Sequence, residues 1–184
     1  MFHTLKTAAL AAALLGSAAS VSLAANPMVG GGEMLETRNI VENAVNSKDH
    51  TTLVAAVKAA GLVETLQGTG PFTVFAPTNA AFAKLPAGAV DGLLKPDMKP
   101  TLTKVLTYHV VAGRHSAADL MNKIKDGNGT TELTTVAGGK LKAMVKGGKV
   151  VLTDEKGGMS TVTQADVFQS NGVIHVVDTV VMPS

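Results

Sequence analysis

Apolar positions in the first part of the chain repeat at helical spacing. Residues 40–45 predict one short helix, and residues 53–57 predict a second helix that ends at Gly61. Ser116 and Asp119 form a capping box, which predicts the start of a later helix. A further apolar stripe of helical period ends in a histidine and consists of Leu102, Val105, Leu106 and His109.

Strand patterns dominate the last third of the chain. Earlier, residues 72–75 predict a strand, and residues 110–113 predict an extended segment. Residues 141–145 alternate apolar and polar side chains, and Gly147-Gly148 predicts a turn into a return strand at 150–153. Residues 173–181 are apolar on both faces, which predicts a central buried strand. Helices that precede strands in this way indicate an α+β domain.

The N-terminal segment predicts export. Residues 1–24 contain one charged side chain, a short apolar run and small residues at Ser22 and Ala24, as in a cleaved signal peptide. We therefore expect a secreted protein, extracellular or periplasmic. Residues 25–37 contain three consecutive glycines and predict a flexible leader, so the expected domain is 38–184.

Composition narrows the classes of function. The 184 residues include no cysteine, which excludes a thiol nucleophile, a thiolate metal site and a lipidated cysteine. No second apolar span predicts a membrane anchor. A net charge of +2 and 3% aromatic residues do not favour nucleic-acid binding. We expect no cofactor. Asn128-Gly129-Thr130 fits a glycosylation sequon, which matters only in a host that glycosylates exported proteins.

Three segments resemble the signature blocks of fasciclin domains, in the family order. Residues 72–82 (FTVFAPTNAAF) resemble the first block, residues 106–111 (LTYHVV) the tyrosine–histidine block, and residues 170–178 (SNGVIHVVD) the second block. The resemblance covers about residues 38–183. One departure is Ala112, where family members usually have proline.

The resemblance implies a fold and a class of function. The implied fold is a β-sandwich or wedge, of mainly C-terminal strands, flanked by helices. The implied function is non-catalytic adhesion to an extracellular or cell-envelope protein or glycan.

Two pairs of residues are candidate contacts by family position. Tyr108 and His109 belong to the tyrosine–histidine block, although a histidine on the buried face of a helix is more often a core group with satisfied hydrogen bonds. A tyrosine can bury its ring and expose its hydroxyl. Asp166 and Val167 align with a segment that carries aspartate–isoleucine motifs proposed for integrin binding in animal relatives; a packed strand with Asp166 at its edge explains the same residues.

A third candidate site is a cluster of lysines. Lys140, Lys142 and Lys146 share one face of a predicted strand, and Lys149 follows the turn. Such a face can bind anionic glycans or lipid headgroups. The alternative is a solvated face whose lysines discourage edge pairing.

Other chemistry is weakly indicated. His109, His115 and His175 have no spacing at which two histidines chelate one metal, and we interpret His175 as structural. Thr78 and Asn79 are interpreted as backbone caps at a corner between strand and helix. Besides adhesion, two hypotheses stay open. One is a small-ligand or cofactor carrier with a cleft between helices and sheet, and the other is a hydrolase that uses the scattered histidines.

The signal peptide generates a first prediction. Exported material should begin at Ala25, because Ser22 and Ala24 fit the small-residue pockets of signal peptidase. N-terminal sequencing of the exported protein checks this, and a retained Met1 would contradict it.

Overall fold

The computed structural model of the chain describes residues 26–184; the predicted signal peptide lies outside the described residues. The strands are β1 (Met28–Val29), β2 (Gly32–Glu33), β3 (Phe72–Pro77), β4 (Val110–Ala112), β5 (Thr130–Thr134), β6 (Lys140–Lys146), β7 (Lys149–Thr153), β8 (Met159–Gln169) and β9 (Gly172–Val177). The helices and 3-10 turns are α1 (Ile40–Ala44), η1 (Lys48–His50), α2 (Thr51–Ala60), α3 (Val63–Gln67), α4 (Asn79–Ala83), α5 (Ala89–Leu93), η2 (Pro96–Met98), α6 (Lys99–Tyr108) and α7 (Ala117–Asp126).

Seven strands form one bent sheet in the order β4-β3-β9-β8-β7-β6-β5. The pair β3–β9 is parallel, and every other pair in this sheet is antiparallel. Two register shifts bend the long strand β8. A bridge between Val111 and Thr135 joins β4 to the end of β5, so the two ends of the sheet meet. The predicted α+β class and the expected fold are confirmed.

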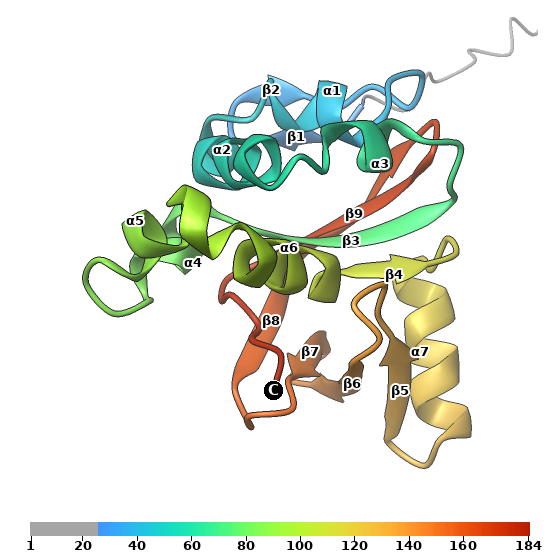
Figure 1. Cartoon of the computed structure of the whole chain (residues 1–184). Helices are drawn as coiled ribbons and strands as arrows, with labels where there is room; N and C mark the ends of the chain where they lie inside the picture. The colour runs from blue at the N-terminus through green and yellow to red at the C-terminus, as the bar shows by residue number, and fades with distance from the viewer. Residues whose placement is uncertain (1–25) are drawn as a thin grey trace, which may run out of the picture.

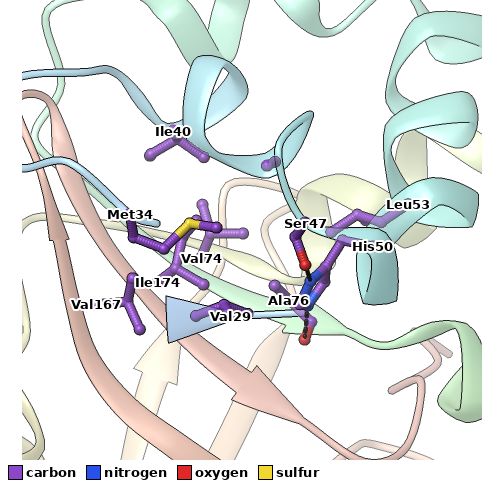
Figure 2. Close-up of a pocket in the computed structure, with 11 residues that line it drawn as sticks. Val29, Met34, Ile40, Ser47, His50, Leu53, Val74, Ala76, Val167 and Ile174 are labelled. Carbon is purple, nitrogen blue, oxygen red and sulfur yellow. Dashed lines mark hydrogen bonds between the residues drawn. The ribbon is translucent and has the colours of Figure 1, made fainter. Parts of the chain in front are cut away.

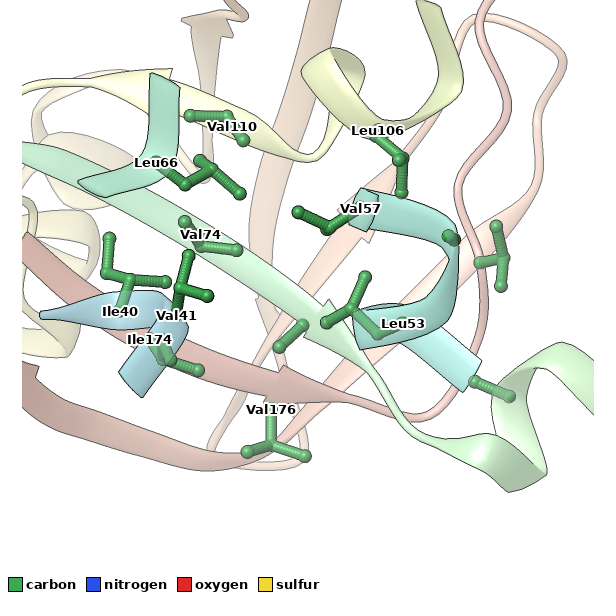
Figure 3. Packing of buried hydrophobic residues seen from close by; sticks show 14 of the residues in the cluster. Ile40, Val41, Leu53, Val57, Leu66, Val74, Leu106, Val110, Ile174 and Val176 are labelled. Carbon is green, nitrogen blue, oxygen red and sulfur yellow. The ribbon is translucent and has the colours of Figure 1, made fainter. Parts of the chain in front are cut away.

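The pair β3–β9 is buried on both faces. Val74 and Ile174 face a cluster formed with helices α1, α2, α3 and α6, which we call the helix-side cluster (Figure 3). The alternate residues Phe75 and Val177 face a second cluster, the sheet-side cluster, which is formed with α7 and strands β5 to β8. Figure 1 shows β3 and β9 with helices α1 to α3 on one side and strands β5 to β7 with α7 on the other. The apolar run at the C-terminus therefore does belong to a central strand.

The predicted helices form where local signals place them. Gly61 ends α2 in the left-handed conformation (φ 71°), which glycine adopts without steric cost. The Ser116–Asp119 capping box begins α7. The stripe on α6 is buried throughout, including His109.

Two local predictions need adjustment. The strand predicted for residues 173–181 ends at Val177, because Asp178 pairs with Thr161 through its backbone and its carboxylate. The residues after it leave the sheet, although Val180 and Val181 stay buried. Val45, expected on the apolar face of α1, ends that helix and is 52% exposed.

The expected flexible leader is corrected, because residues 26–37 are part of the packed structure. Strands β1 and β2 form a hairpin on the helix-side cluster, where Val29 and Met34 are buried. A Cβ on Gly32 would lie 2.2 Å from the Asn46 carbonyl oxygen, so the glycine permits this close approach. The Asn43 side chain accepts from the Leu35 amide and donates to the Leu35 carbonyl.

The buried hairpin generates a second prediction. Met34→Ala should lower the free energy of unfolding by about 2–5 kcal/mol, because it removes a core side chain and leaves a cavity. Met28, 57% exposed on the same hairpin, is the matched control, and Met28→Ala should change it by less than about 0.5 kcal/mol. Urea unfolding measures both. If both substitutions changed the free energy of unfolding by less than about 0.5 kcal/mol, residues 25–37 would have to be interpreted as a flexible leader after all.

Candidate functional site

Asn79 connects the corner after β3 to the helix layer. Thr78 caps α4 by accepting from the Ala81 amide. The side-chain oxygen Oδ1 of Asn79 accepts from the Thr52 amide, and its side-chain NH2 group donates to the Lys48 carbonyl. Asn79 therefore joins β3 to the start of α2, in agreement with a structural cap.

Tyr108 is fully buried in the sheet-side cluster. Its hydroxyl donates to the Lys140 carbonyl (2.6 Å) and accepts from the Glu155 amide (3.2 Å). Burial raises the pKa of this phenol. The candidate role of Tyr108 as a surface contact is therefore corrected: its hydroxyl joins α6 to strand β6 and to the turn that follows β7.

His109 is likewise a buried connector, which corrects its candidate role as a contact. Its Nδ1–H donates to the Val105 carbonyl, and Nε2 accepts from the Val181 amide (3.1 Å). A carbonyl can only accept and an amide can only donate, so these partners fix a neutral ring. Burial lowers the pKa of His109 to about 4.

Asp166 and Val167 lie at a bulge in β8 and face different surroundings. Val167 is completely buried in the helix-side cluster, which corrects its assignment as a contact. Asp166 is half-buried, and its carboxylate accepts from the Ala117 amide at the start of α7 (2.7 Å). This carboxylate is therefore already committed to a helix terminus.

His175 has a structural position. It is buried in β9 and stacks on Phe75, with ring centroids 5.6 Å apart. Its Nε2–H donates to the His115 carbonyl (2.7 Å), and Nδ1 accepts from the Asp166 amide (3.2 Å). Both ring nitrogens are bonded to protein groups, so neither is free to bind a metal in this arrangement.

The remaining candidates form one exposed surface. Lys140, Lys142 and Lys146 lie on the outer face of β6, and Lys149 of β7 stands directly opposite Lys146. The acidic residue in register with them is Glu132 of β5, opposite Lys142. We call these four lysines the lysine face. Strand β6 lies between β5 and β7, so its lysines do not protect a sheet edge.

The lysine face is supported from behind by α7. Leu120 and Ile124 of this helix pack in the sheet-side cluster against Leu141 and Ala143 of β6, whose side chains alternate with the lysines. Like charges directly opposite each other on a sheet repel, as at Lys146 and Lys149. A bound anion would relieve this repulsion.

A cavity under the N-terminal hairpin bears on the carrier hypothesis. It lies between the helices and the sheet, and Val29 and Met34 cover its apolar walls (Figure 2). Ser47 and His50 are its polar residues and bond to each other (2.8 Å). The cavity encloses about 20 Å³, room for about one water molecule, so it does not favour a carrier.

The described part of the chain also bears on metals and membranes. Within residues 26–184, no three His, Asp or Glu side chains are placed to share a metal ion. In the same range, no helix has the length and apolar character that a membrane crossing requires.

Comparison with known proteins agrees with the fold and with the signature blocks. The model of the Fasciclin domain family matches residues 48–183. The chain belongs to the fasciclin family. It is 52% identical over 144 residues to Protein sll1483 of Synechocystis sp., which covers 78% of this chain and 73% of that protein. It is 36% identical over 179 residues to the cell surface glycolipoprotein MPB83 of Mycobacterium bovis, which covers 94% and 74%.

A solved FAS1 domain pair from the insect cell adhesion molecule Fasciclin I has the same fold. The TM-score is 0.68 at 19% identity, and the match covers 77% of this chain and 50% of that chain. The family match begins after the hairpin β1–β2 and α1, so these elements extend the matched fasciclin region in this chain.

Three connectors of this fasciclin domain were not identified from the sequence. Asn171 accepts from the Ile40 amide and donates to the Leu66 and Gly68 carbonyls. Asp154 accepts from the amides of Gly158 and Met182, and His50 binds the Ala76 carbonyl. An aspartate before a Gly-Gly turn is a usable local signal. Asn171 lies inside the second signature block, but its partners are distant in sequence.

The neutral state of His109 generates a third prediction. An unfolded histidine titrates near 6.5, so the unfolded chain binds more protons between that pH and about 4. The contribution of His109 to the free energy of unfolding is therefore full above about pH 6.5 and is lost as the pH falls towards about 4. The loss amounts to about 3 kcal/mol. Urea unfolding across this range measures the loss.

His109→Gln is the control for that loss. It should be less stable than the wild type at neutral pH, because buried bonds are disturbed, and should lose about 3 kcal/mol less on acidification. A pH dependence identical to that of the wild type would contradict the assignment.

Proposed function

We propose that this fasciclin domain is an exported surface-interaction module, without catalysis, that attaches to a protein or polysaccharide of the cell envelope or extracellular space. Membership of the family supports the class of function, and the similar proteins include a cell surface glycolipoprotein and a cell adhesion molecule. The expected export after residue 24 agrees with that setting.

The observation that carries the proposal is the lysine face. Of the sequence-predicted contacts, Tyr108, His109 and Val167 are buried. Asp166 is occupied by α7. The lysines are exposed and lie on a regular sheet surface. We infer that the partner carries carboxylate, sulfate or phosphate groups, which would lie along β6 and neutralise it.

The chemistry of the face sets the expected behaviour. Attraction between exposed charges is screened over about 8 Å at physiological salt, so binding should weaken as salt rises. The face has no aromatic side chain on β6 or β7 for stacking against sugar rings. Affinity should therefore come from charge, and recognition should be of an acidic polymer.

Charge reversal gives a fourth prediction. The probe is immobilised dextran sulfate, with uncharged dextran as the blank, and the sample is the chain that begins at Ala25. The combined variant Lys140→Glu, Lys142→Glu and Lys146→Glu should lose at least about tenfold in affinity, because attraction becomes repulsion.

The matched control carries the same change in net charge on other elements. Lys58→Glu, Lys95→Glu and Lys99→Glu alter exposed lysines that lie on neither β6 nor the supporting helix α7. The affinity of this variant for dextran sulfate should fall by about threefold at most, because only the long-range electrostatic field of the protein changes. Equal losses in the two variants, or no binding of the wild type to dextran sulfate, would reject the lysine face as the site.

A further inference from the structure

The bulge in β8 brings Asp166 and His175 together in an unusual backbone geometry. The register with β9 places one extra residue between Gln164 and Val167, opposite His175. Asp166 has φ of 58°, in the left-handed region that few non-glycine residues adopt. This conformation lets its amide donate to the His175 ring while its carboxylate reaches the amide of Ala117. One residue therefore links a buried ring to a helix.

The connection between β4 and α7 depends on few buried side chains. Thr73 of β3 donates to the Gly113 carbonyl and accepts from the His115 amide. His175 donates to the His115 carbonyl. Asp166 then satisfies the amide of Ala117, the first residue of α7, which has no partner inside the helix. The start of α7 is thus pinned to the central strands.

Protonation of His175 is incompatible with the hydrogen bond that its ring accepts from the Asp166 amide. The ring nitrogen Nδ1 accepts from the Asp166 amide. A proton from solvent on Nδ1 would point at this N–H group, so both partners would be donors. The negatively charged group that acts on this ring is the carboxylate of the same Asp166. The Nε2–H bond to the His115 carbonyl is unaffected by this proton.

We propose that Asp166 and His175 form an acid-sensitive latch on helix α7: when His175 gains a proton, the Asp166 carboxylate leaves the Ala117 amide and binds Nδ1–H. The first turn of α7 then loses its tether to β8. Because α7 supports β6 from behind, acidification loosens the platform of the lysine face. The latch is independent of the proposed function, since it concerns the domain itself.

The surroundings of His175 agree with a proton that arrives only in acid. Burial lowers the pKa of His175. The charged groups that face it are the Asp166 carboxylate of β8, which opposes this shift, and the His115 ring, which adds to it. From β3 it contacts the uncharged ring of Phe75. His115 is itself held near Lys123 of α7, whose ammonium group donates to its Nδ1 (3.1 Å).

The test, a fifth prediction, follows single amides by NMR between about pH 7.5 and about pH 4.5. Protection of the Ala117 amide from hydrogen exchange, corrected for intrinsic rates, should fall about tenfold, the effect of losing one charge-assisted bond. The midpoint should coincide with that of the His175 ring signals. Amides of β3 and β9 should stay protected, because only α7 is released. A change that appears at all amides together would be global unfolding and would overturn the latch.

Variants separate the latch from general acid sensitivity. His175→Gln cannot take up the proton, and Asp166→Asn keeps an acceptor oxygen without the charge. In both variants the acid-dependent fall in protection of the Ala117 amide should disappear. In His109→Gln, which alters another buried histidine, this fall should remain. A fall retained in a folded His175→Gln variant would overturn the proposal. If that variant does not fold, the wild-type midpoints decide, and a difference of more than about one pH unit between Ala117 and His175 would overturn it.

Discussion

The parallel pairing of β3 with β9 is the constraint on which the rest of the structure depends. It joins residues 72–77 to residues 172–177, with the rest of the sheet on either side. Helices cover one face of the pair and curled strands with α7 cover the other, so neither face meets water (Figure 1). Every polar group near the pair must therefore find a partner within the protein, because a buried unpaired group costs about 1–3 kcal/mol.

The polar side chains around this pair meet that demand by joining distant segments. Asn171 ties the start of β9 to α1 and α3, Asn79 ties the end of β3 to α2, and His109 ties α6 to the C-terminal segment. These residues lie in the three blocks by which the chain resembles its family. In this fold these residues of the signature blocks serve as internal connectors.

The proposed partner surface, the lysine face with the outer side of β6, lies outside these buried connectors. Its lysines are held by strands whose other face packs on α7, so the exposed lysines and the buried packing side chains share the same backbone. Asp166 and His175 hold α7 to the central pair. In the proposed latch, a proton on the buried His175 would act on the lysine face through α7.

Local patterns in the sequence determined the helices at 51–60 and 117–126, the Gly147-Gly148 hairpin, the alternation along β6 and the buried C-terminal strand, because caps, turns and periodicity act between neighbouring residues. Only the tertiary structure decided that the hairpin at 28–33 packs on the core. It also decided that Tyr108 and Val167 are buried and that Asp166 binds Ala117. These outcomes depend on contacts between segments far apart in the chain. Side-chain type and spacing do not predict such contacts, because the contacts form only when the pairing of β3 with β9 brings the segments together.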